Sequence, residues 1–105
     1  MPFNYIWEYK DYKIISAKSD SFTAPHIEVF KSIKAADGEY HNCLLMYFHW
    51  YDEKLNQGSI HFIDSKPFEL IEDEDLVLVF NALHDACSKL QKWQNGKIAP
   101  FATSI

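Results

Sequence analysis

The chain has 105 residues, 48% of them hydrophobic and 16% aromatic, and fifteen acids against ten basic residues give it a formal net charge of -5. This length suits one domain spanning residues 1–105, and the apolar content excludes a disordered chain. Every basic residue is a lysine. Because arginine supplies the forked contacts to phosphates and base edges, its absence disfavours a duplex-binding protein.

The sequence carries no signal for a membrane or for export. No run approaches the roughly 18 apolar residues of a membrane span, and the start, MPFNYIWEYKDYK, lacks a basic region followed by an apolar run. Cys43 and Cys87 lie inside hydrophobic patterns without metal-ligand spacing. We therefore expect a cytoplasmic protein with two buried, reduced thiols and no membrane partner.

The first predicted elements are two strands. NYIWEY and YKIISAK flank Lys10 and Asp11, which favours a hairpin that sets Glu8 opposite Lys13. The segment KSDSFTAP is then predicted to be a loop that ends at Pro25.

The second hairpin has the strongest local signal, because Asp37-Gly38 between alternating runs favours a two-residue turn. That turn sets a register in which nearly every apolar residue of one strand lies beside an apolar residue of the other. The expected pairs are Ala36 with Glu39, Ile33 with Asn42, Val29 with Met46, and Ile27 with Phe48.

A third hairpin joins LLMYFHWY to SIHFID. To keep Ile60 and Phe62 on one face with Phe48 and Trp50, the residue numbers of each pair must add up to an even number. The simplest choice sets Phe48 against Phe62, which also places His49 against His61, and a slip of two residues is compatible with the same pattern.

Residues 72–94 are expected to form one helix, followed by a short tail, 96–105. Apolar residues recur there at three- and four-residue steps, as a single buried stripe requires. The stripe comprises Leu76, Val79, Phe80, Leu83, Ala86, Cys87, Leu90 and Trp93. The acids Glu72 to Asp75 at the start complement the helix dipole and offer a cap.

The predicted fold is therefore α+β, with an antiparallel sheet of four to five strands, within residues 3–64, packed on one C-terminal helix. The helix covers one sheet face, which carries Ile27, Val29, Ile33, Leu44, Met46, Phe48, Trp50, Ile60 and Phe62. The other face is the candidate binding face, with His26, Glu28, Phe30, Leu45, Tyr47, His49, Tyr51 and His61. In the alternative arrangement, the first hairpin or the tail covers this second face.

Three histidines form a row on that second face. His26 lies opposite His49, and in the simplest register His49 lies opposite His61, so the three are candidate ligands for one divalent ion such as zinc. The row spans two strand gaps, roughly 9.5 Å, so the outer two must lean inward. The favoured interpretation has no metal or other cofactor: the histidines belong to a half-buried aromatic patch or are isolated surface residues.

These patterns favour a non-enzymatic interaction module over an enzyme. Hydrolase, metalloprotease, phosphate-loop and dinucleotide motifs do not occur in the sequence. We expect the uncovered face to bind a protein partner or a second copy, and an acidic inhibitor or immunity-type protein is a sub-case based on charge alone. The alternatives are a metal-binding enzyme or sensor, and single-stranded nucleic-acid binding through Tyr5, Trp7, Tyr9, Tyr47 or Tyr51.

Overall fold

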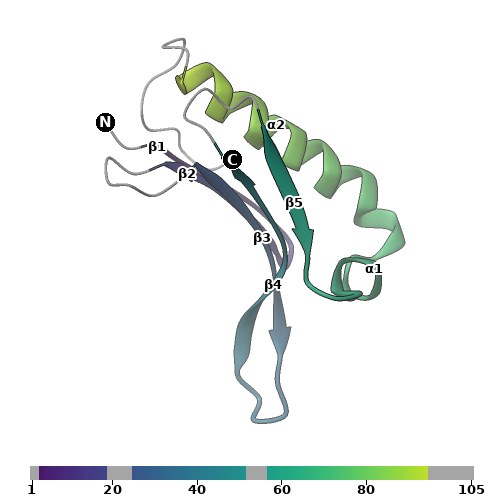
Figure 1. Ribbon diagram of the computed structural model, residues 1–105. Coiled ribbons are helices and arrows are strands. Elements are labelled where there is room, and N and C mark those ends of the chain that lie inside the picture. Colours follow the sequence, from purple (N-terminus) through teal and green to yellow (C-terminus); the bar gives the residue numbers. More distant parts are fainter. Residues whose placement is uncertain (1–2, 19–24, 52–56, 95–105) are drawn as a thin grey trace.

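The computed structural model describes residues 3–18, 25–51 and 57–94, and the expected tail, 96–105, lies outside them. Five antiparallel strands form one sheet in the order β1-β2-β3-β4-β5, and a C-terminal helix packs on it (Figure 1), so the predicted α+β class is confirmed. The elements are β1 (Phe3–Tyr9), β2 (Tyr12–Lys18), β3 (His26–Lys34), β4 (Tyr40–Trp50), β5 (Gly58–Phe62), α1 (Lys66–Leu70), the single-turn η1 (Asp73–Asp75) and α2 (Leu76–Gln94).

The first hairpin forms as predicted. Tyr9 pairs with Tyr12 across the two-residue turn, and Glu8 lies opposite Lys13. Lys10, the first turn residue, has a positive φ of 53°, the left-handed conformation that lets the chain reverse in two residues. The pair joins the sheet as its first two strands and does not fold over the second face.

The turn of the second hairpin differs from the prediction. The Ala35 N–H bonds to the Glu39 carbonyl, so three residues, 36–38, form the loop, and Gly38 takes the positive φ of 84° that such loops require. Near the turn Ile33 therefore pairs with His41 and not with Asn42.

A β-bulge then restores the predicted register. The pairing shifts between Val29 and Phe30, which leaves Leu45 as an extra residue in β4. From there on Val29 pairs with Met46 and Ile27 with Phe48, as expected. The bulge also explains why Leu45, predicted for the binding face, is fully buried beside Met46.

The third hairpin is displaced by two residues from its simplest register. Phe48 pairs with Ile60, and His49 pairs with Ser59. A shift of two residues keeps every side chain on its predicted face. Gly58 explains the choice, because a Cβ at this position would lie 2.5 Å from the His49 carbonyl oxygen. Only glycine allows the backbones to approach this closely.

The C-terminal helix covers the predicted residues, with η1 as its first turn. Its buried stripe is rotated from the predicted one: Ala82 is buried, whereas Leu76 and Phe80 are 38% and 41% exposed. The initial acids also differ, since Asp75 is buried and bonded to the first hairpin. Sequence periodicity identified the helix but not the exact angle at which it meets the sheet.

The core lies between α2 and the strands β1 to β3. Phe3, Tyr5, Trp7, Ile14 and Val29 are at most 7% exposed on that face. Ile60 and Phe62, which the alternation also assigns to the core face, are each 46% exposed. The helix therefore covers one half of its sheet face and leaves the β5 side open, among the residues that the structure describes.

Two further predictions concern cysteine and membranes. Cys43 and Cys87 are free thiols, and both are partly and not fully buried. Burial raises the pKa of the Cys87 thiol to about 11, so this sulfur stays protonated and unreactive at neutral pH. Within residues 3–18, 25–51 and 57–94, no helix is long and apolar enough to span a membrane.

Candidate functional site

The predicted binding face lies on the side of the sheet opposite α2. Strand alternation puts His26, Glu28 and Phe30 there, because their neighbours Ile27 and Val29 are fully buried under the helix side. Tyr47, His49 and His61 are partly exposed on the same face, and Tyr51 follows β4 with 65% of its surface exposed. Leu45 is the one member of the predicted set that belongs to the core.

Two of the predicted histidines meet. The Nε2 atoms of His49 and His61 lie 3.1 Å apart, and the rings are near-parallel, with centroids 5.1 Å apart. They do so from diagonal positions, since His49 pairs with Ser59 and His61 with Tyr47. A hydrogen bond between the two rings at this distance requires that one Nε2 carries the hydrogen and the other accepts it.

Ser59, which was not among the residues predicted for this face, completes a small hydrogen-bonded network. Its Oγ lies 2.8 Å from Nε2 of His61 and 3.3 Å from Nε2 of His49. The Tyr51 hydroxyl donates to the same Oγ at 2.8 Å. The signal that could have found Ser59 is Gly58, because a glycine required opposite Trp50 sets the register that brings Ser59 beside His49.

Aromatic contacts hold the two imidazoles on both sides. Tyr47 stacks on His61 with centroids 4.6 Å apart and planes 13° apart, and Tyr51 meets His49 edge-on at 5.2 Å. We call Tyr47, His49, Tyr51, Ser59 and His61 the histidine cluster. Four rings joined by successive contacts lose little conformational freedom on binding, which suits a recognition surface.

His26 occupies the predicted place opposite His49. Its Nε2 lies 3.5 Å from Oε1 of Glu28, an ion pair when the imidazole is protonated. Across the described segments, no group of three histidine, cysteine or acidic side chains converges in a way that could hold a metal ion. Two of the three predicted ligands are thus in contact, and the third faces a carboxylate.

Two aromatic residues considered for base stacking are not available on the surface. Tyr5 and Trp7 are 1% and 7% exposed, because they point toward α2. Tyr9, Tyr47 and Tyr51 remain at least partly exposed. Tyr47 and Tyr51 lie in and just after β4, whereas Tyr9 ends β1 at the other edge of the sheet.

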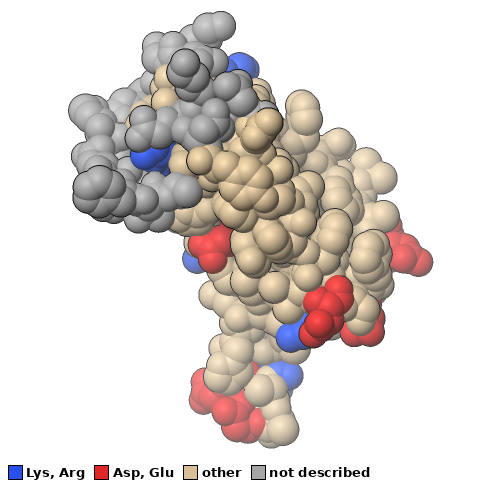
Figure 2. All heavy atoms as spheres, viewed as in Figure 1, with Lys and Arg blue, Asp and Glu red and all other residues tan. Residues whose placement is uncertain are grey.

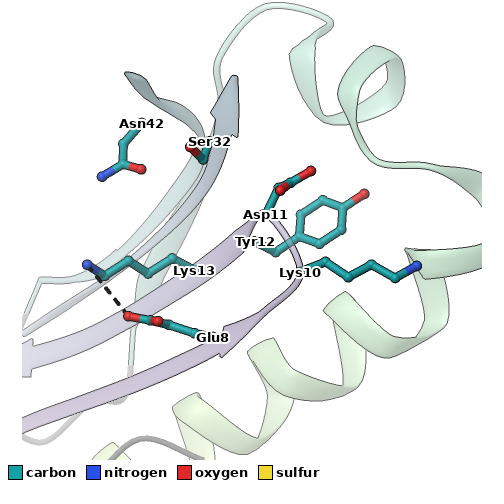
Figure 3. A pocket seen from close by; sticks show the side chains of 7 residues that line it. All are labelled: Glu8, Lys10, Asp11, Tyr12, Lys13, Ser32 and Asn42. Carbon is teal, nitrogen blue, oxygen red and sulfur yellow. Dashed lines mark ion pairs between the residues drawn. The ribbon is translucent and has the colours of Figure 1, made fainter. Parts of the chain in front are cut away.

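A separate hollow of about 310 Å³ lies at the end of the first hairpin (Figure 3). It is lined by Glu8, Lys10, Asp11, Tyr12, Lys13, Ser32 and Asn42. Lys13 and Glu8 form an ion pair at 3.9 Å, and Lys10 and Tyr12 point away from that pair (Figure 3). These polar groups do not converge on one point, so the histidine cluster remains the better candidate.

Asp75 bonds to Lys10 and Tyr12, the two side chains that point away from the Glu8–Lys13 ion pair. Its carboxylate accepts a bond from Lys10 Nζ at 2.9 Å and another from the Tyr12 hydroxyl at 3.1 Å. The hydrogen bond from Lys10 lowers the pKa of the Asp75 carboxyl below its ordinary value, although burial acts in the opposite direction. This contact connects the first hairpin to the start of α2 and is structural.

Comparisons of the chain with models of protein families, with curated proteins and with solved structures found no match.

Proposed function

We propose that this chain is a non-enzymatic interaction module that binds another protein, an identical copy included, through the histidine cluster. The observation that supports this proposal is the contact of four rings and one hydroxyl on a partly exposed sheet face. Tyrosine and other aromatic residues are enriched where interfaces gain most of their affinity. Histidine and serine add hydrogen-bonding groups that can orient a partner.

The partner's charge follows from the chain's own. A net charge of -5 favours association with a basic protein, as in an inhibitor or immunity-type protein that occludes a basic surface. Two free thiols are compatible with a reducing compartment such as the cytoplasm. The compartment and the inhibitor role are parts of this proposal.

The test is a double variant, Tyr47→Ala with Tyr51→Ala, compared with Tyr40→Ala as a control on an exposed tyrosine of the second hairpin. Sedimentation velocity measures self-association, and quantitative capture from the source cells measures binding of other proteins. We expect the double variant to lose an association that the control keeps, with little change in the melting temperature. A much lower melting temperature with unchanged association would show that these rings stabilise the fold instead.

Metal binding by the His49–His61 pair is a second candidate, supported by the spacing of the two nitrogens. Two imidazoles on one tetrahedral zinc, each with a Zn–N bond of about 2.05 Å, have nitrogens roughly 3.4 Å apart. The Nε2 atoms lie 3.1 Å apart. Ser59 Oγ lies close to both, at 2.8 and 3.3 Å, so a small outward movement of the rings creates a site with two nitrogen ligands.

Native mass spectrometry with added zinc tests this candidate. We expect one ion per chain in the wild type, loss of the ion in His49→Ala and His61→Ala, and retention in His41→Ala, whose imidazole lies on the second hairpin. His26→Ala asks whether the third predicted ligand contributes. Equal zinc uptake by all four variants would place the ion elsewhere and remove this candidate.

A further inference from the structure

A second surface, on the other side of β5, consists of apolar side chains left open beside the helix. We call it the apolar flank, and it comprises Ile60 and Phe62 of β5, Phe68 of α1, and Leu76 and Phe80 of α2. Between 38% and 72% of each residue is exposed. Four of the five were expected to be buried, because the alternation of β5 and the periodicity of α2 assign Ile60, Phe62, Leu76 and Phe80 to the core.

One ring contact and the phase of α2 place these residues on the same side of the molecule. Phe62 and Phe68 meet with ring centroids 5.7 Å apart. In α2, Asp85 and Lys89 face β1, where Asp85 accepts a bond from the Tyr5 hydroxyl. At about 100° per residue, Leu76 and Phe80 lie on the opposite side of the helix axis, toward β5.

The flank is apolar and free of charge at its centre. Figure 2, in the view of Figure 1, shows an uncharged surface over β5 and the adjoining part of α2, with acidic and basic groups at its borders. Taking about 200 Å² for a full aromatic side chain, the five residues expose on the order of 500 Å². This area matches the largest apolar patch of a typical monomer, and a patch of this size is often a binding site.

Within the part of the chain that the structure describes, no strand pairs with the outer edge of β5, and its backbone groups adjoin the flank. The Tyr51 N–H bonds to the Gln57 carbonyl, and the Ile63 N–H bonds to the Leu45 carbonyl, so odd-numbered residues of β5 face β4. The N–H and C=O of Ile60 therefore point away from the sheet. Among the described residues β5 is a terminal strand, and GSIHF contains no lysine or proline to block pairing.

We infer that β5 and the apolar flank form a two-fold interface with a second copy of this chain, the two β5 strands pairing antiparallel about Ile60. In that register Gly58 lies opposite the partner subunit's Phe62, a pairing that covers the glycine with an aromatic ring. The flank's roughly 500 Å² and the strand edge together approach the ~800 Å² per subunit of a stable dimer.

A second copy fits this surface better than a charged partner. Each copy carries a net charge of -5, so two copies repel wherever their acidic surfaces approach. An uncharged flank is the region where that repulsion is smallest and the gain from apolar burial is largest. A two-fold axis also closes the assembly, whereas an open edge strand invites continued pairing.

Sedimentation equilibrium on the full chain tests this interface. We expect a wild-type dimer, and weakening by at least about a hundredfold in Phe68→Glu, which places a charge on the apolar flank next to Phe62. Ile60→Pro removes an outward N–H without affecting a bond to β4 and should weaken the dimer too. Tyr40→Glu, an equally exposed ring outside the flank, is the control and should dimerise as the wild type does.

Three results would overturn the inference. They are a wild type that stays monomeric at the highest soluble concentration, a dimer whose affinity Phe68→Glu and Ile60→Pro leave unchanged, and a monomer whose Ile60 amide is protected from hydrogen exchange by its own chain. Phe68 is 72% exposed, so its variant keeps the monomer folded. The Tyr47 and Tyr51 variants change the opposite sheet face. A dimer weakened by them and not by Phe68→Glu would assign self-association to the histidine cluster, and the reverse result would assign it to this interface, so the two failures are distinguishable.

Discussion

The two edges of the sheet present the same type of face to the helix and are covered very differently. In β1 the residues on this face, Phe3, Tyr5 and Trp7, are 1 to 7% exposed, whereas Ile60 and Phe62 of β5 are each 46% exposed. Both strands place large apolar side chains on this face. The difference therefore lies in where α2 sits and not in the hydrophobicity of either edge.

Small residues and polar contacts position the helix on the β1 side. Ala82 and Ala86 let α2 approach the sheet closely, and the Ser16 hydroxyl donates to the Ala86 carbonyl at 3.4 Å. The Tyr5 hydroxyl bonds to Asp85 on the same side. Since a helix is about 10 Å wide and strands are about 4.8 Å apart, one helix covers only two or three strands.

The largest expected loss of stability is at Phe3 on the covered edge, and Phe62 on the open edge is its comparison. Phe3→Ala should lower the free energy of unfolding by about 3–5 kcal/mol, because Phe3 is buried and contacts Trp93 with ring centroids 5.5 Å apart. Phe62→Ala should lose about 1 kcal/mol or less at concentrations where the protein is monomeric. Urea unfolding measures both, and equal losses would show that the β5 edge is covered in solution.

A second effect concerns the contact that ties the first hairpin to α2. Because Lys10 lowers the Asp75 pKa, the carboxylate stabilises the fold at pH values above its ordinary pKa of 3.8, and this stabilisation is lost as the pH falls toward the lower folded pKa. Asp75→Asn should therefore be less stable at neutral pH and should lose less on acidification. Urea unfolding at several pH values tests this, and parallel curves for the two proteins would contradict it.

The smallest effect is expected at the exposed ion pair of the first hairpin. Glu8→Gln removes the contact with Lys13, whose atoms lie 3.9 Å apart on partly exposed side chains. We expect a change of about 0–1 kcal/mol in thermal unfolding, since solvent screens such pairs. A larger loss would mean that charge across the hairpin, and not burial under α2, accounts for the stability of this edge.

The sequence predicted the fold class and most of the strand pairing for reasons that can be traced to particular residues. The Lys10-Asp11 turn and the Glu8–Lys13 pair were read correctly, because a two-residue hairpin has one register. Ile27 and Val29 were paired correctly only because the bulge at Leu45 cancels a one-residue error at the Asp37-Gly38 turn. Bulges depend on tertiary packing and have no local signal in this segment.

The candidate site was predicted in part. His26 lies opposite His49 as expected, whereas His49 and His61 meet diagonally after a two-residue shift set by Gly58. Ser59 went unnoticed because serine in a strand has no distinctive pattern. The exposure of Leu76 and Phe80 was also not predictable, since helical periodicity gives the apolar side but not which strands lie beneath it.

The second hairpin extends beyond the helix-covered part of the sheet (Figure 1), and residues 34–42 are all exposed. Between Phe30 and Leu44, the part of the hairpin that contains the turn, no residue is buried in the core. A foreign peptide inserted between Asp37 and Gly38 would therefore be displayed at the tip of a two-stranded arm while the rest of the domain folds as before. The arm offers a place for a fluorescent label or an affinity epitope away from both the histidine cluster and the apolar flank.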